Sequence, residues 1–288
     1  MSNYLILILL TLLAAGTPIF GRLALEGFPP FALGLVRFSL AALLLLITLF
    51  VFRKGNLKFK PQDKKKIFWL GLICIPLNQS FFLGGLSLSA ASHAGLIYGL
   101  SPVLVLIFSI YSKYEKVSRR KTAGFILSFF GVAYLFIDSG VSLSSDYLLG
   151  DIVLFFAVLT WAAYVTYSKP LVVEYGALKV NTAVFSVGVL CFAPIAGFDL
   201  VNIHPEKLTT ISIMGFLYLS VLTSFVGYFL WSFILKRMET TKVVIMSNLS
   251  PLLAVAFGII FLNEPLTHGL MIGSIFTVSG IFIVQFSK

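Results

Sequence analysis

Ten runs of apolar residues, separated by short polar connections, limit what this chain can fold into. Each run approaches or exceeds the roughly 20 residues that a helix needs to cross a bilayer. Helices satisfy their own backbone hydrogen bonds in lipid, and the short alternating strands of a membrane barrel are missing from the sequence. We therefore expect an all-α membrane protein with ten transmembrane helices. The runs cover residues 4–24, 30–52, 67–87, 91–112, 121–138, 148–168, 178–198, 209–235, 242–262 and 268–286.

The composition agrees with a lipid environment. Residues of the AVILMFWYC set make up 59% of the chain and charged residues 11%, whereas charged residues form roughly a quarter of a soluble domain. The net charge of +10 does not indicate nucleic acid, because the basic residues lie in the short connections. Cys74 and Cys191 lie inside apolar runs, and the sequence contains neither metal-ligand spacing nor a cofactor motif. We expect a lipid bilayer and a small-molecule substrate as partners, and no nucleic acid, cofactor or metal.

The basic residues also predict the orientation. If the N-terminus is cytoplasmic, 18 Lys and Arg residues fall on the cytoplasmic side and only Arg22 and Lys207 outside, with Arg37 within the second run. Cytoplasmic loops are enriched in Lys and Arg. The split favours an even number of spans, with both termini in the cytoplasm of a multi-pass protein of the cytoplasmic membrane. The sequence is compatible with a monomer and does not fix the oligomeric state.

The two halves of the chain resemble each other at a constant offset in sequence number. This offset is the number of positions from Pro102 to Pro251, and we call it the repeat interval. The predicted repeats are residues 1–140 and 148–288, with five spans each. Because five is odd, the second repeat enters the membrane from the opposite side, which predicts an inverted repeat with a substrate site near the midplane. The earlier spans of each half align less clearly. The matching pairs are Ser101 and Ser250, Pro102 and Pro251, Glu115 and Glu264, Gly124 and Gly273, and Gly131 and Gly280.

Pro102 and Pro251 stand about 12 and 10 residues into their runs, near the middle of the membrane at 1.5 Å per residue. A proline inside a helix removes a backbone hydrogen bond and frees the carbonyl four residues earlier, here at Tyr98 and Ser247. Two interpretations stay open. The prolines are packing kinks, or they are hinges beside a cavity.

Residues 86–136 and 235–284 resemble the EamA-type ten-span branch of the drug/metabolite transporter superfamily. Both stretches have a small-residue helix, a proline within it, a glutamate in the next loop and glycines in the last span. Supporting segments are LVRFSLAALLLL at 35–46 and LTWAAYVTYSKPL at 159–171. The resemblance implies a secondary transporter that exports or exchanges small metabolites, such as amino acids or amphipathic or aromatic compounds, by alternating access. It does not name the substrate.

Polar residues inside the apolar runs are the candidates for substrate contact. Arg37 either anchors a substrate carboxylate or serves as a structural cation bonded to carbonyls or reaching outward, because a buried cation needs a cavity or a partner. Asn78 and Gln79 either bond between helices or line a polar path. Asn248, beside Ser247 and next to the second proline, is a further candidate.

Aromatic residues form a second set of candidates. Trp161 and Tyr164 are three positions apart, and Tyr228 begins the same spacing in the eighth run. They line the cavity, where rings could stack on a substrate or cage an ammonium group, or they belong to an interfacial belt. Tyr98 precedes Ser247 by the repeat interval, so the repeats offer an aromatic ring in one half and a hydroxyl in the other.

Other function classes are less consistent with the sequence. There is no nucleotide-binding loop and no carboxylate is expected deep in a span, which favours a uniporter or exchanger; proton coupling through Glu26 or His93 stays open. A membrane enzyme would need convergent acid, base or metal groups. A channel or an uptake carrier remains an alternative that flux measurements separate from an exporter.

Overall fold

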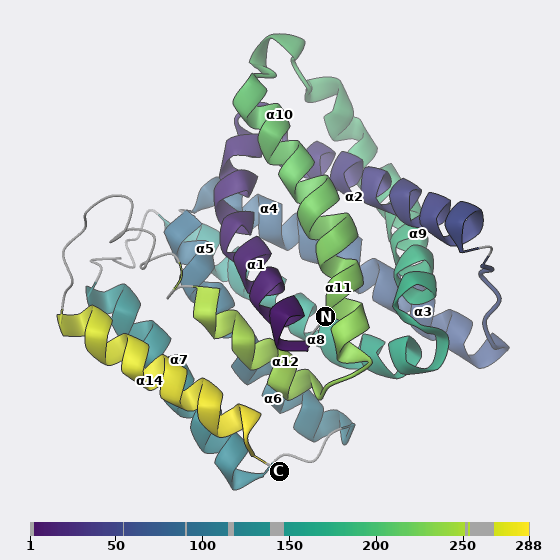
Figure 1. Cartoon of the computed structure of the whole chain (residues 1–288). Coiled ribbons are helices and arrows are strands. Elements are labelled where there is room, and N and C mark those ends of the chain that lie inside the picture. The colour runs from purple at the N-terminus through teal and green to yellow at the C-terminus, as the bar shows by residue number, and fades with distance from the viewer. Residues whose placement is uncertain are drawn as a thin grey trace.

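A computed structural model describes residues 3–53, 55–89, 91–114, 118–138, 147–250, 253 and 268–287. In these ranges the chain forms a bundle of helices without a strand (Figure 1). Six helical segments are long and apolar enough to cross a membrane. The predicted all-α membrane class is confirmed. The number of ten helices stays a prediction, because most of residues 251–267 lie outside the described part.

The elements are, in chain order, α1 (Asn3–Leu25), α2 (Pro30–Ile47), η1 (Thr48–Phe52), α3 (Pro61–Leu72), η2 (Ile73–Leu77), α4 (Asn78–Leu88), α5 (Ala91–Tyr98), α6 (Ser101–Ser112), α7 (Arg119–Asp138), α8 (Leu148–Tyr175), α9 (Ala177–Ala196), η4 (Gly197–Asn202), η5 (Pro205–Lys207), α10 (Thr210–Leu217), η6 (Tyr218–Gly227), α11 (Tyr228–Leu235), α12 (Thr240–Ile245), η7 (Met246–Asn248) and α14 (His268–Gln285). Of these, η1, η2 and η6 are π-helical and η4, η5 and η7 are 3-10 helices.

The helix bounds follow the repeat interval even where the sequence match is weak. α3, η2 and α4 run on as one segment, Pro61–Leu88, and α10, η6 and α11 as another, Thr210–Leu235. The starts of the two segments are separated by the repeat interval, and the π turns of η2 correspond to residues 222–226 inside η6. The starts of α5 and α12 are separated by the same interval. Helix geometry therefore extends the repeat to spans that the sequence alone aligns poorly.

The fourth predicted run is interrupted near its centre. α5 ends at Tyr98, a turn follows at residues 99–100, and α6 begins at Ser101. The expectation of a kink at Pro102 within one helix is wrong, because Pro102 is the second residue of a new helix. The first turn of a helix tolerates proline, since its N–H groups have no intrahelical partner there. Pro251 lies outside the described residues, but the η7 turn before it interrupts the mate helix at the corresponding place.

α7 and α14 lie side by side at one edge of the bundle (Figure 1). Their backbones approach closely at glycines. A Cβ atom built on Gly280 would lie 2.5 Å from both Gly124 O and Ser128 N, and one on Gly131 would lie 2.5 Å from Thr277 N. Small residues allow such contacts between membrane helices. The glycine pairs of the repeat thus join the last described helix of each half.

Gly280→Ala is expected to lower the thermal stability of the purified protein. The new methyl meets backbone atoms that cannot rotate away, and overpacking of this kind costs about 1–3 kcal/mol. Gly84→Ala is the matched control, because no heavy atom lies within 4 Å of a Cβ placed there. The control should be neutral or slightly stabilising, since alanine favours a helix by about 1 kcal/mol over glycine. Equal melting temperatures for both variants would contradict the close packing of α7 and α14.

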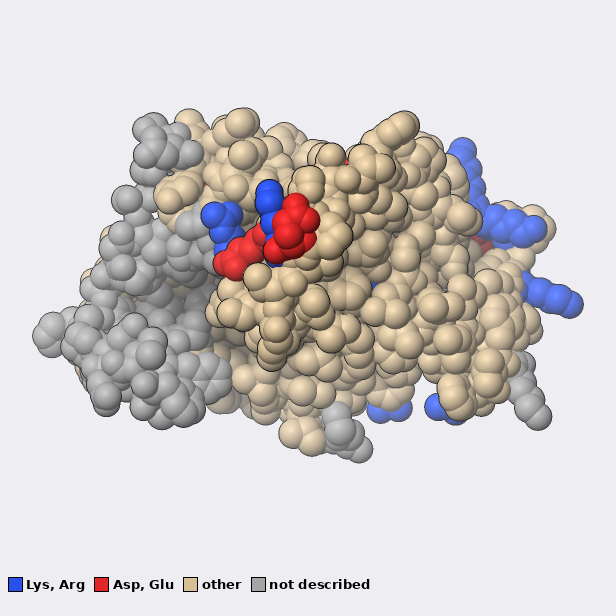
Figure 2. Space-filling model, turned by 90° about the horizontal axis from the view of Figure 1, so that it is seen from above, with Lys and Arg blue, Asp and Glu red and all other residues tan. Residues whose placement is uncertain are grey.

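The outer surface suits lipid. Large apolar side chains such as Phe52, Tyr111, Leu190 and Ile275 are exposed. Figure 2 shows a face on which uncharged atoms cover most of the surface and charged side chains form small groups. In water such a continuous apolar surface would be an aggregation or binding liability. In a bilayer it is the expected boundary.

Candidate functional site

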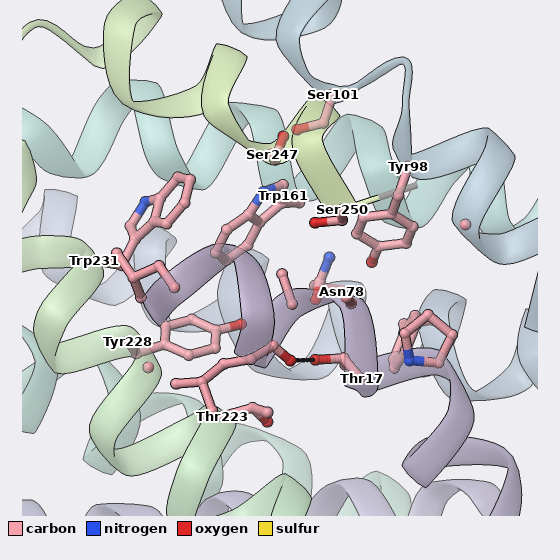
Figure 3. A pocket seen from close by; sticks show the side chains of 18 of the residues that line it. Thr17, Asn78, Tyr98, Ser101, Trp161, Thr223, Tyr228, Trp231, Ser247 and Ser250 are labelled. Atoms are coloured by element: carbon pink, nitrogen blue, oxygen red, sulfur yellow. Dashed lines mark hydrogen bonds between the residues drawn. The ribbon is translucent and has the colours of Figure 1, made fainter. Parts of the chain in front are cut away.

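A chamber of about 490 Å³ lies at the centre of the bundle, beside both helix interruptions. Helices α1, α2, α4, α8 and α11 form its walls, together with η6 and the ends of α5, α6 and η7. Figure 3 shows Trp161, Tyr228 and Trp231 on one side of this chamber and Tyr98 on the other. Its volume is within the range of about 300–1,000 Å³ that is typical of small-molecule sites.

Most of the residues predicted from the sequence to contact substrate line this chamber. They are Arg37, Asn78, Gln79, Tyr98, Trp161, Tyr228 and Ser247. Tyr164 and Asn248 are not among the lining residues. The Tyr164 hydroxyl lies 3.4 Å from Asn181 Oδ1 in the protein interior, and Asn248 Nδ2 donates to Ser128 Oγ of α7 at 2.9 Å. Those two side chains connect helices in this structure. That any of the nine residues binds substrate stays a prediction.

Both halves of the chain contribute equivalent positions to the wall. Five pairs of lining residues are separated by the repeat interval, and they come from α4 with the η6–α11 segment and from the two interruptions. The pairs are Asn78 with Gly227, Gln79 with Tyr228, Phe82 with Trp231, Tyr98 with Ser247, and Ser101 with Ser250.

Two residues of the chamber wall, Phe82 and Thr223, are not singled out by the sequence, because each resembles an ordinary residue of a transmembrane span.

Arg37 is a buried cation in the wall, 3% exposed. Its Nε donates to Ser224 Oγ at 2.6 Å, Nη1 to Gln79 Oε1 at 3.3 Å and Nη2 to Thr223 Oγ1 at 3.1 Å. All three acceptors are neutral. Among the described residues no carboxylate forms a salt bridge with Arg37. The positive charge is therefore hydrogen-bonded but not neutralised by the described part of the protein.

Gln79 continues this network across α4. Its Nε2 donates to Asn78 Oδ1 at 2.8 Å, and Asn78 Nδ2 donates to Ala157 O at 2.8 Å and to Thr160 Oγ1 at 3.1 Å in α8. The chain of bonds joins α2, α4, η6 and α8. The two amides thus serve as interhelical bonds and as wall residues at once, so the alternatives left open by the sequence are both present.

The aromatic side chains form one connected cluster. The Trp161 ring lies 5.4 Å from that of Tyr228, 5.5 Å from Trp231 and 5.9 Å from Tyr164, measured between centroids. Such separations are typical of favourable aromatic pairs. Tyr164 supports the cluster from behind, while the other three rings face the chamber. Trp161 and Tyr228, candidates from two different spans, therefore meet in the wall and give it a broad apolar surface.

Two polar atoms of chamber residues are buried without a hydrogen-bond partner among the described residues. They are Ser101 Oγ, at the interruption before α6, and Trp231 Nε1. Buried polar groups are nearly always paired, with protein or with water. Both atoms are enclosed by protein, so neither offers a hydrogen bond to the interior of the chamber in this conformation.

A buried His–Asp pair lies away from the chamber wall. His93 Nδ1 of α5 lies 2.9 Å from Asp151 Oδ2 in the first turn of α8, and Ser89 Oγ donates to Asp151 Oδ1. His93 is 4% and Asp151 8% exposed. Asp151 is not among the residues that the sequence singles out; it stands in the first turn of α8, near the end of its run, and its side chain is nevertheless buried. Only the packing of α5 against α8 encloses it.

A second ion pair holds the start of the mate helix. Lys121 Nζ of α7 donates to Glu239 Oε2, at the N-cap of α12. Both α5 and α12, the first parts of the two interrupted runs, are thus tied to a neighbouring helix near their N-termini, α5 by the His93–Asp151 contact and α12 by an ion pair. Within the described ranges no three His, Cys, Asp or Glu side chains converge as metal ligands would.

Comparison with known proteins gives consistent matches over the whole chain. The model of the EamA-like transporter family matches residues 1–137 and 148–286. A protein of Archaeoglobus fulgidus named an uncharacterized transporter is 29% identical, over 98% of this chain and 96% of its own. The uncharacterized transporter YetK of Bacillus subtilis is 25% identical over 100% and 88%. A WAT1-related protein of Arabidopsis thaliana is 25% identical over 99% and 85%.

One solved crystal structure superposes with a TM-score of 0.78 and covers 99% of this chain and 96% of the other. At 18% identity it supports the fold alone.

Proposed function

Since the chain belongs to the EamA-like transporter family, we propose that it is a secondary transporter that moves small amphipathic metabolites across the cytoplasmic membrane by alternating access. The proposed mode of transport is export of the metabolite or its exchange for another solute. The observation that carries the proposal is the central chamber, whose wall takes equivalent positions from both halves and adjoins both interrupted helices. Transporters built from inverted repeats bind substrate at such places.

Two similar halves give a physical route to alternating access. When the halves exchange conformations, the chamber opens to the other side while the site stays near the midplane. The interruptions at Tyr98–Ser101 and at η7 provide short non-α-helical turns that can change angle while the flanking helices stay intact. Of the proposed hinges, Pro102 stands in the first turn of the helix that follows the interruption, and Pro251 lies outside the described residues.

A counterflow measurement in liposomes tests the proposed function. Purified protein is reconstituted, the vesicles are loaded with a high concentration of unlabelled solute, and uptake of the labelled solute is followed. A carrier gives saturable flux and a transient overshoot in the loaded vesicles. A channel gives linear flux without overshoot, and an enzyme gives a chemically altered product; either result would exclude the proposal.

The proposed orientation places residues 197–209 outside the cell and residues 53–60 in the cytoplasm. We expect a membrane-impermeant maleimide to label Asn202→Cys in intact cells and Lys58→Cys only after the membrane is opened. Both positions are exposed, and the variants are made after replacement of Cys74 and Cys191 by alanine. The reverse labelling pattern would place the termini outside.

A further inference from the structure

Arg37 brings an unneutralised positive charge to the chamber, and this determines what the chamber can hold. Of the five N–H groups of an arginine, three are used in bonds to Ser224, Gln79 and Thr223. None of the described residues that line the chamber is Asp or Glu. A buried charge needs compensation, and no described carboxylate supplies it at Arg37.

The rest of the wall describes the remainder of a molecule that would bind in the chamber. Trp161, Tyr228 and Trp231 form a connected aromatic surface. The centroid of the Trp161 ring lies 5.4 Å from that of Tyr228 and 5.5 Å from that of Trp231. The apolar surface suits a ring or branched hydrocarbon.

We propose that the substrate is an amphipathic carboxylate, with its anionic group at Arg37 and its apolar body against Trp161, Tyr228 and Trp231. This inference rests on the proposed transport function and adds the chemical class of the solute. Arginine matches a carboxylate with paired N–H donors. The same charge repels an ammonium group, so the aromatic rings do not serve as a cage for a cation here, although such rings alone could.

The structural alternative is that Arg37 only ties α2 to η6 and α4 through its three neutral acceptors. In that case the charge of the solute would not matter for binding. The two interpretations therefore differ in a quantity that can be measured without any variant, namely the preference of the wild-type protein among solutes that differ only in charge.

Three probes of nearly equal size supply the test: 3-phenylpropanoate, 3-phenylpropan-1-ol and 3-phenylpropan-1-aminium. Binding is measured by tryptophan fluorescence of the purified wild-type protein and transport by counterflow. We expect the carboxylate to bind about tenfold or more tightly than either of the others, a factor that corresponds to about 1.4 kcal/mol. Equal or tighter binding of the alcohol or the ammonium compound, or no binding of the carboxylate, would overturn the inference.

The variants Arg37→Lys and Arg37→Gln test whether Arg37 is the residue that causes the preference for the carboxylate. Arg37→Lys should keep the preference for the carboxylate, and Arg37→Gln should abolish that preference. If Arg37→Gln does not fold, the wild-type series still decides. Saturable flux of the alcohol or the ammonium compound without carboxylate preference would refute this inference and leave the transporter proposal intact, whereas channel-like flux of all three would refute the transporter proposal.

Discussion

Ala14→Trp should nearly abolish transport while the protein remains folded. Ala14 lies on α1, lines the chamber and is exposed within it. An indole at this position would occupy space that a solute needs. Overpacking of this kind costs about 1–3 kcal/mol, which corresponds to roughly fivefold to 150-fold weaker occupancy. The initial rate of counterflow at low solute concentration should fall by the same factor.

Ala14→Ser is the matched control, since it changes polarity at almost constant size. It should transport at close to the wild-type rate. Size-exclusion chromatography and the melting temperature establish that both variants fold. Wild-type flux through the tryptophan variant would mean that solutes do not pass through this chamber, and the functional assignment of its wall would then be lost.

His93→Leu is expected to cause the largest loss of stability from a single substitution. It leaves the Asp151 carboxylate buried between α5 and α8, with the Ser89 hydroxyl as its remaining described donor. Leaving a buried polar group without its hydrogen-bond partner typically costs about 1–3 kcal/mol, and more where the group is charged. Thermal unfolding in detergent should show a large decrease in melting temperature.

The double variant His93→Leu/Asp151→Leu separates burial of a charge from loss of packing. Replacing both members of a buried pair by apolar residues is often neutral or stabilising. The double variant should therefore recover most of the melting temperature that the single variant loses. If both variants are equally unstable, shape at the α5–α8 contact matters more than the charge of Asp151.

The membrane class could be predicted because apolar length alone decides it. The repeat could be recognised where backbones touch, as at Gly131 and Gly280, since only small residues fit there. In the Pro61–Leu88 and Thr210–Leu235 segments any apolar residue keeps a helix in lipid, so few positions match in sequence, although the segment starts are one repeat interval apart and the residues equivalent to η2 lie within η6. Structure retains the repeat interval where sequence no longer shows it.

The site was predicted in part, for similar reasons. Arg37, Asn78 and Gln79 stand out because polar groups are rare in spans, and all three line the chamber. The spacing of aromatic residues along a helix predicted the chamber wall less well. A residue three positions from Trp161 is turned by about 60° around the axis, and this places Tyr164 behind the wall rather than in it.

Proline allowed two local outcomes that the sequence cannot distinguish. Pro102 is compatible with a kinked helix and with the first turn of a new one. The choice depends on the neighbours of the interrupted backbone, which only the packed structure supplies. The burial of Asp151 could not be predicted from the sequence for the same reason, because it follows from the contact of α5 with α8 in the folded protein.

The paired wall positions have a kinetic consequence. Tyr98 occupies in one half the position that Ser247 holds in the other, and Gln79 the position of Tyr228, so exchanging the conformations of the halves does not recreate the same surroundings for the solute. A carrier of this kind must have different half-saturation concentrations at its two membrane faces. Microscopic reversibility then requires a compensating difference in maximal rates, so that unequal apparent affinities alone can never drive accumulation.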